Sequence, residues 1–144
     1  MKKNILWLIG TVILLFLSGC GQSIKLPENP IKFVTYDFYN PENPEDGYRA
    51  FDYNGRTYIL FSSVKKSMKK SDIDECLGYI VQDGIQGELV ISLSAFENDD
   101  VLMTYYPNGF MEPYLIYRAI DTKGQVLSFP DYMDSESMYK FWKE

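Results

Sequence analysis

The residues YRAFDYNGRTYILFSSV, numbers 48 to 64, predict a β-hairpin that sets the fold class. Asn54-Gly55 lies between two runs of alternating residues, and both residues of a two-residue hairpin turn need positive φ, which Asn and Gly tolerate best. A loop of two residues also fixes the register. The expected pairs are Tyr53 with Arg56, Phe51 with Tyr58 and Arg49 with Leu60 on one face, and Tyr48 with Phe61, Ala50 with Ile59 and Asp52 with Thr57 on the other. Because both faces carry aromatic rings, we expect both to be covered.

Further short runs rich in β-branched and aromatic residues lie on either side of this hairpin, and they read as strands. The expected strands are residues 31–39, 77–81, 89–93, 101–106, 114–120 and 125–129. Turn residues separate them at 40–47, 82–87, 97–100 and 121–124. The last of these turns is expected to close a second hairpin, with Gly124 in the left-handed conformation.

Two short helices complete the prediction. Ser71-Asp72-Ile73-Asp74 resembles a capping box, so a helix of about two turns is expected from there to Gly78. A C-terminal helix is expected from Asp134 or Ser135 to Trp142, and its docking face would carry Met138, Phe141 and Trp142. The fold class is therefore a β-rich α+β domain, mainly an antiparallel sheet or small barrel, with an all-β sandwich as the alternative.

Composition excludes several kinds of function. The chain has 144 residues, no histidine and a formal net charge of −6. Without histidine, Ser/His/Asp, Cys/His and His-based zinc chemistry are excluded. An acidic chain also lacks the basic character typical of nucleic-acid binders, so no nucleic-acid partner is expected.

The N-terminal residues predict export from the cytoplasm. Lys2 and Lys3 precede an apolar run from Ile5 to Leu17, which fits the apolar region of a secretory signal peptide and is too short for a spanning helix. The run ends in Leu17-Ser18-Gly19-Cys20, which resembles the lipobox of bacterial lipoprotein precursors at all four positions. The resemblance implies that Cys20 is diacylglycerated on sulfur, that residues 1–19 are removed, and that the new N-terminus is often acylated.

This resemblance divides the chain into three parts: a signal peptide at 1–19, a flexible tether at 20–30 and one globular β-rich domain at 31–144. Two acyl chains suffice for stable anchoring, so we expect the protein on the extracytoplasmic face of a cell membrane, held there through Cys20. Cys76 is then the single remaining thiol. No disulfide is possible within the chain, and Cys76 is expected to be a small buried apolar residue.

Aromatic residues provide the first candidate site. Tyr105 and Tyr106 precede an apolar loop that contains Phe110 and Met111, and these four residues are the predicted binding residues. A broader platform for sugar rings or a protein would add further tyrosines and a phenylalanine; ordinary sheet packing is the alternative reading. Its members would be Tyr36, Phe38, Tyr39, Tyr48, Tyr53, Tyr114 and Tyr117.

Charged clusters give weaker candidates. The run KKSMKK, residues 65–70, either contacts anionic lipid headgroups near the anchor or forms a solvated loop. Acidic groups at 42–46 and 97–100 either bind Ca²⁺ or lie in solvated turns, and neither has the spacing of an EF-hand loop. No metal or other cofactor is predicted.

The favoured function is a non-catalytic binding module for a protein or glycan. Immunity proteins and accessory subunits are examples of small anchored lipoproteins of this kind. The alternative is a small cell-envelope hydrolase that uses paired carboxylates.

Overall fold

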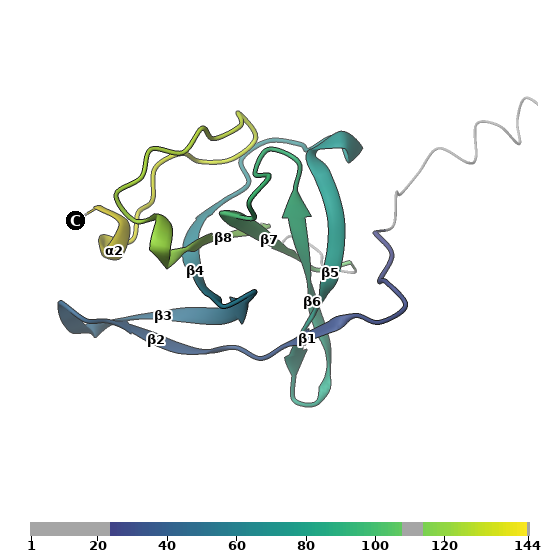
Figure 1. Cartoon of the computed structure of the whole chain (residues 1–144), viewed down its shortest axis with the longest axis horizontal. Helices are drawn as coiled ribbons and strands as arrows, with labels where there is room; N and C mark the ends of the chain where they lie inside the picture. Colours follow the sequence, from purple (N-terminus) through teal and green to yellow (C-terminus); the bar gives the residue numbers. More distant parts are fainter. Residues whose placement is uncertain (1–23, 108–113, 144) are drawn as a thin grey trace, which may run out of the picture.

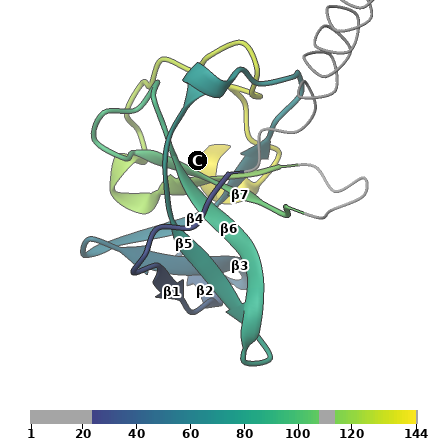
Figure 2. The ribbon, with the colours of Figure 1, turned by 90° about the vertical axis from the view of Figure 1, so that its right-hand side faces the viewer.

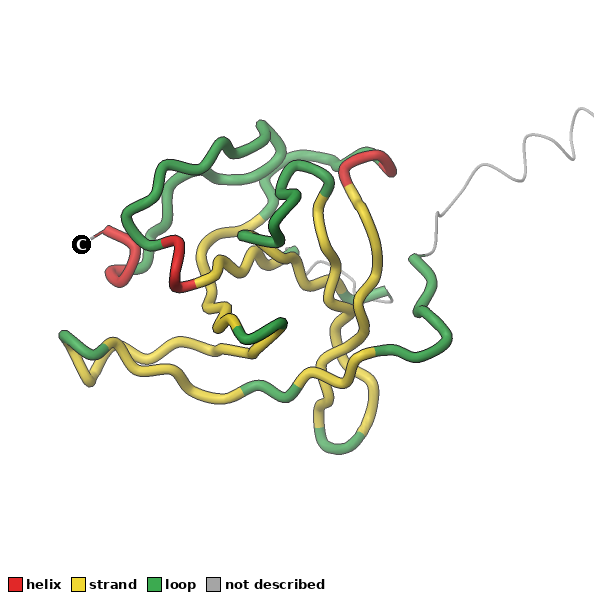
Figure 3. Tube along the Cα trace, in the orientation of Figure 1, coloured by secondary structure: helices red, strands yellow, loops and turns green. Residues whose placement is uncertain are grey.

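The computed structural model describes residues 24–107 and 114–143. Strands dominate it, and its helices are short segments of three or four residues (Figure 3). In chain order the elements are β1 (Ile31–Phe33), β2 (Tyr36–Asn40), β3 (Asn43–Tyr53), β4 (Arg56–Ser63), η1 (Lys70–Asp72), β5 (Ile73–Gln82), β6 (Ile85–Leu93), β7 (Val101–Tyr105), β8 (Leu115–Ala119), η2 (Ile120–Thr122) and α2 (Lys140–Lys143). No helix in this part of the chain has the length and apolar character needed to cross a membrane.

The eight strands form one sheet in the order β1-β5-β6-β7-β8-β4-β3-β2. β1 and β5 are parallel and the other neighbours are antiparallel, so the sheet is mixed and mainly antiparallel. It curls into a half-barrel (Figures 1 and 2). β1 and β2 are the two edges of this sheet although only Val34 and Thr35 separate them in sequence. The β-rich prediction is confirmed, and the single sheet replaces the alternative of a two-sheet sandwich.

The hairpin at 48–64 forms as its sequence predicts. Four of the six expected pairs form, from Tyr53 with Arg56 to Ala50 with Ile59, and the regular pairing of β3 with β4 ends there. Asn54 and Gly55 have φ of 49° and 73°, as a two-residue hairpin turn requires. Both faces are covered in part, as expected: Phe51 and Tyr58 are buried on one face and Ala50 and Ile59 on the other, whereas Asp52 near the turn is exposed.

Besides a small cluster of Tyr48, Ala50, Ile59 and Phe141 next to α2, two larger clusters of buried side chains hold the sheet together. Strands β6, β7 and β8 alternate their side chains between these clusters, so each strand stabilises both faces. The inner cluster consists of Phe33, Phe51, Tyr58, Leu77, Ile80, Val90, Leu102, Tyr117 and Ala119. The outer cluster consists of Phe61, Leu89, Ile91, Leu93, Phe96, Val101, Met103, Ile116, Tyr132 and Met133. Residues of the loop that precedes α2 belong to this outer cluster and cover that face of the sheet.

The internal helix expected from Ser71 to Gly78 is wrong. Only η1 is helical there, and strand β5 begins at Ile73. The capping interaction lies two residues earlier than predicted, because the Lys69 N–H donates to Asp72 Oδ2 at 2.6 Å. β5 is the strand that pairs with both β1 and β6, so its backbone hydrogen bonds come from the sheet. Pairing with two neighbouring strands therefore outweighs a local helix signal.

Other boundaries differ from the predictions. The strand expected at 31–39 is split into β1 and β2, and the turn expected at 40–47 is confined to residues 41–42. Asp83-Gly84 forms a two-residue turn, so β6 begins earlier than expected. Gly124 does have positive φ, at 81°, but residues 125–129 form no strand. They belong to a loop in which Leu127 and Phe129 pack on the outer cluster.

The C-terminal helix is shorter than expected and spans only α2. Phe141 is buried, and Trp142 is half-buried with its indole N–H donating to Leu60 O at 2.9 Å. Met138 is 78% exposed, so its place in the docking face is wrong. Tyr139 takes part in the packing instead and contacts Tyr48, with ring centroids 5.7 Å apart.

Candidate functional site

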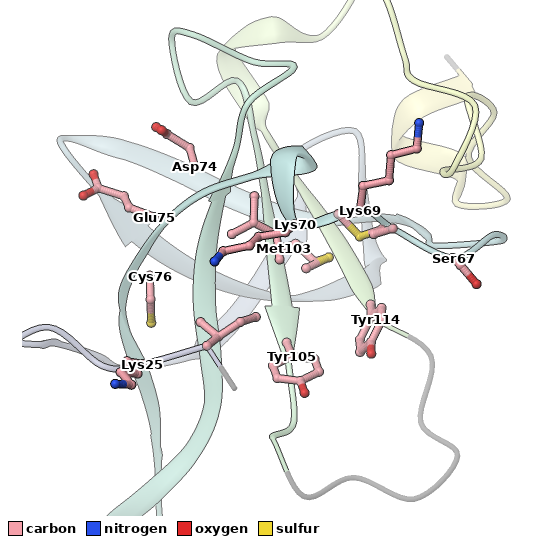
Figure 4. A pocket seen from close by; sticks show the side chains of 13 residues that line it. Lys25, Ser67, Lys69, Lys70, Asp74, Glu75, Cys76, Met103, Tyr105 and Tyr114 are labelled. Atoms are coloured by element: carbon pink, nitrogen blue, oxygen red, sulfur yellow. The ribbon is translucent and has the colours of Figure 1, made fainter. Parts of the chain in front are cut away.

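A groove of about 570 Å³ lies beside the point where the described chain begins (Figure 4). Segments far apart in sequence line it: the chain before β1, the loop that leads into η1, the first half of β5, the end of β7 and the residue before β8. Its lining residues are Ile24, Lys25, Ser67, Met68, Lys69, Lys70, Ile73, Asp74, Glu75, Cys76, Met103, Tyr105 and Tyr114.

Two tyrosines form one end of this groove. Tyr105 and Tyr114 lie with ring centroids 5.0 Å apart and planes tilted by 55°, and Figure 4 shows them side by side. Burial raises the pKa of Tyr114, with a further contribution from Tyr105, so its phenol stays neutral at physiological pH. Met103, which is on β7 like Tyr105, adds apolar surface to the groove. This end of the groove offers apolar area together with hydroxyl groups.

Lysines line other parts of the groove. The turn that leads into η1 positions Lys69 and Lys70, because Asp72 accepts a hydrogen bond from the Lys69 N–H and donates its own N–H to Lys69 O at 3.0 Å. Lys25 comes from the chain before β1. All three lysines are exposed. Among the described residues, none of the three has a carboxylate partner in an ion pair.

The first two lysines of KKSMKK behave differently. Lys65 lies 3.5 Å from a carboxylate oxygen of Asp134, and Lys66 lies 3.5 Å from one of Asp131. Both pairs are exposed, and such pairs contribute little to stability. Within the described chain, Lys69 and Lys70 are therefore the two lysines of KKSMKK that form no ion pair.

The β5 wall of the groove carries Asp74, Glu75 and Cys76. Cys76 is half-buried, less than the sequence predicts, and its thiol approaches Gly78 O at 3.7 Å. Burial raises the pKa of this thiol, which keeps it protonated and weakly nucleophilic. The two acids are successive residues of one wall, whereas a glycosidase pair faces its substrate from two sides. The groove therefore supports binding better than hydrolysis.

Each of the two acidic groups has one carboxylate that contacts a neighbouring polar side chain. Asp46 accepts a hydrogen bond from Asn40 at 3.2 Å, and Asp100 pairs with Arg56 at 2.8 Å. Within residues 24–107 and 114–143, no three acidic or cysteine side chains gather as metal ligands would.

The predicted binding residues divide into three groups. Tyr105 lies in the groove. Tyr106 does not line it, and its hydroxyl donates to Gln82 Oε1 at 2.9 Å. Phe110 and Met111 lie outside the described residues, as do Leu17, Ser18, Gly19 and Cys20.

Sequence reasoning missed the part of the tether that joins the groove. The described part of the expected tether begins at Ile24, and Ile24 and Leu26 pack against the outer cluster. Their spacing of two residues around Lys25 is the signal in the sequence, because alternate residues of an extended segment share a face.

A second candidate surface follows β1 and β2. We name Ile31, Val34, Tyr36 and Tyr39 the edge strip, and these side chains are 42%, 72%, 42% and 56% exposed. The free edge of β2 has no strand partner within the described residues. Tyr36 and Tyr39 lie on opposite faces of that edge because three positions separate them in the strand. Tyr39 pairs with Gly47 on β3, whose missing side chain leaves room for the tyrosine ring.

The remaining tyrosines of the predicted platform are less accessible. Tyr48 and Tyr117 are buried, while Phe38 and Tyr53 are half-buried. The platform therefore reduces to Tyr36 and Tyr39 on the edge strip and to Tyr105 and Tyr114 at the groove.

Comparison of the chain with protein-family models, curated proteins and solved structures finds no significant match.

Proposed function

We propose that this protein is a lipid-anchored, extracytoplasmic binding module without catalytic activity, and that it engages a protein through the edge strip. The lipobox-like residues 17–20 support the anchor. The observation that carries the binding function is the edge strip itself. Its four exposed apolar side chains follow the two edge strands β1 and β2 and the link between them, and the outer side of each of these strands has no strand partner in the described chain.

A protein fits this edge better than a glycan does. The free edge of β2 presents backbone N–H and C=O groups in the geometry that an added strand requires. Tyr39 would flank such a strand on one face. Tyr36 lies on the other face, across β3, where its hydroxyl donates to Asp52 Oδ1 at 2.6 Å and its ring stays 42% exposed. Tyrosine supplies apolar area at low entropic cost. β2 also carries no lysine or proline, the residues that commonly block edge pairing.

The position of the edge strip agrees with this role. Figure 1 shows the described chain entering at one end of the molecule, while β2 and β3 extend to the opposite end. A module anchored through residue 20 would thus present the tip of its edge strand away from its point of attachment.

Two charged substitutions test the proposal. Tyr39→Lys and Tyr36→Lys each place a cation at the free edge, and each is expected to weaken partner binding by about 30-fold, the effect of losing an interface residue worth about 2 kcal/mol. The measurement is recovery of a stoichiometric partner from envelope extracts by the full chain, followed by titration of that partner.

Met138→Lys is the matched control, because Met138 is an exposed apolar residue outside the edge strip. Its binding is expected to equal that of the wild type. Equal loss of binding in all three variants would contradict a role for β2. If no partner is recovered and envelope glycan is hydrolysed instead, the hydrolase alternative replaces this proposal.

A further inference from the structure

We infer that the groove side of the domain docks on anionic lipid headgroups of the membrane that holds the anchor. The contact surface, which we name the basal patch, consists of Lys25, Lys69, Lys70, Tyr105 and Tyr114. This inference rests on the proposed anchoring through Cys20 and goes beyond it, because an anchor alone leaves the domain free to turn.

The length of the connecting chain places the basal patch near the bilayer. Ile24 lines the groove and is the first described residue. Cys20 precedes it by four residues, which span at most about 14 Å when fully extended. The tether also packs on the domain from Ile24 onward, so the groove has no long free linker between itself and the anchor.

Charge favours contact between this surface and anionic lipids. The whole chain has a formal charge of −6, yet the groove lining holds three lysines against two acids. The three lysines are exposed and have no carboxylate partner among the described residues. A lysine close to an anionic leaflet strengthens binding by about fivefold. A body that is acidic elsewhere would be repelled by the same leaflet, so this side is the one that faces it.

The aromatic residues suit the same environment. Tyrosine is enriched at membrane–water interfaces, where its ring contacts acyl chains and its hydroxyl remains hydrated. Tyr105 and Tyr114 form a pair at the groove, and Tyr114 is 36% exposed. Exposed lysines and tyrosines that line one groove suit a membrane interface.

Docking would have a consequence for binding. The basal patch alone would bind lipid weakly. The anchor holds it at high local concentration beside the bilayer, so a few charge contacts suffice to keep the domain docked. A docked domain has one preferred orientation. The tip of the β2–β3 hairpin lies at the end of the molecule opposite the start of the described chain, so it would project away from the bilayer (Figure 1).

Lysine labelling tests the inference on the full chain purified from membranes. The protein is reconstituted in vesicles of phosphatidylcholine, with or without phosphatidylglycerol, and acylated with a water-soluble reagent. Lys25, Lys69 and Lys70 are expected to react about fivefold more slowly on the anionic vesicles. Lys140 and Lys143, which are exposed on α2 at the other end of the molecule, are internal controls with unchanged rates. About 1 M NaCl should remove the protection, because the Debye length then falls to about 3 Å.

A pair of matched variants gives a second readout. Lys69→Glu with Lys70→Glu is expected to abolish the protection of Lys25, whereas Lys140→Glu with Lys143→Glu should leave it intact. Equal labelling rates on both vesicles would overturn the docking. Equal protection on both vesicles would overturn the role of headgroup charge, and protection that appears only with added membrane proteins would assign the patch to a protein.

The lipid state of each sample is read from its intact mass before labelling. A bare Cys20 would overturn the anchor and the docking together. A lipidated Cys20 with unprotected lysines would overturn the docking alone.

Discussion

Replacing Gly78 by valine is expected to lower the free energy of unfolding by about 3 kcal/mol and to detach β1 from the sheet. Gly78 pairs with Ile31, and a Cβ atom at Gly78 would overlap the backbone O and N atoms of Ile31. Both are backbone atoms, so no side-chain rotation relieves the clash. Displacing β1 would also withdraw Phe33 from the inner cluster, where its ring lies 5.4 Å from that of Phe51.

Urea unfolding measures the loss of stability, and amide hydrogen exchange of residues 31–33 measures the pairing of β1. Asp74→Val is the control, because it places the same side chain at an exposed position of β5 and should change stability by no more than about 0.5 kcal/mol. Wild-type stability of the Gly78→Val variant, with β1 still protected, would show that the two strands do not approach as described.

Replacing Arg118 by alanine is expected to cost about 3 kcal/mol of stability. Arg118 is 7% exposed on β8. Its guanidinium donates to Thr122 Oγ1 at 2.8 Å, to Thr122 O at 2.7 Å and to Gln125 O at 2.9 Å. Burial lowers the pKa of Arg118, but a guanidinium remains charged in proteins. Three aromatic rings surround this cation. Their centroids lie 5.3 Å away for Phe61, 5.9 Å for Phe129 and 5.0 Å for Trp142.

Arg118→Lys separates the contribution of the hydrogen bonds from that of the cation–π contacts. Lysine keeps a cation among the rings but cannot form the same set of hydrogen bonds. We expect it to lose about half as much stability as the alanine variant. Trp142 is the single tryptophan after residue 19, so its fluorescence reports both unfolding and the packing around Arg118. An alanine variant as stable as the wild type would contradict this role.

The parts of the fold that were predictable are those encoded by adjacent residues. The Asn54-Gly55 hairpin and strand β8 follow from local alternation and turn chemistry, and the sequence contains all of that information. The helix prediction for residues 71–78 is wrong because the capping signal depends on neighbouring residues, whereas the pairing of this segment with β1 and β6 depends on residues far away in sequence. The close contact between Gly78 and Ile31 joins residues 47 positions apart, and no pattern in either segment announces it.

The candidate sites show the same difference between features encoded by adjacent residues and contacts between distant ones. Tyr105 was recognisable as a binding candidate from its exposed loop, but Lys25 and Lys70 join it only after β1, β5 and β7 assemble. The buried surroundings of Arg118 depend likewise on the loop at 125–129 and on α2, which the sequence predicts as a strand and as a longer helix. Arg118 is the one charged residue of the strand predicted at 114–120, and no pattern in that stretch indicates the partners that bury it.

The anchor is the premise on which location, orientation and partner all depend. If Cys20 carries lipid, a single thiol remains in the mature chain, and the groove lies close to the bilayer because four residues separate Cys20 from Ile24. The β-rich domain does not depend on this premise, because its buried clusters form without a disulfide within the described residues.

Intact mass spectrometry of the protein isolated from the membrane fraction tests this premise most directly. We expect a chain that begins at Cys20 and carries a diacylglyceryl thioether, with or without an acyl group on its amine. A chain that begins elsewhere, or one with an unmodified Cys20 thiol, would contradict the account.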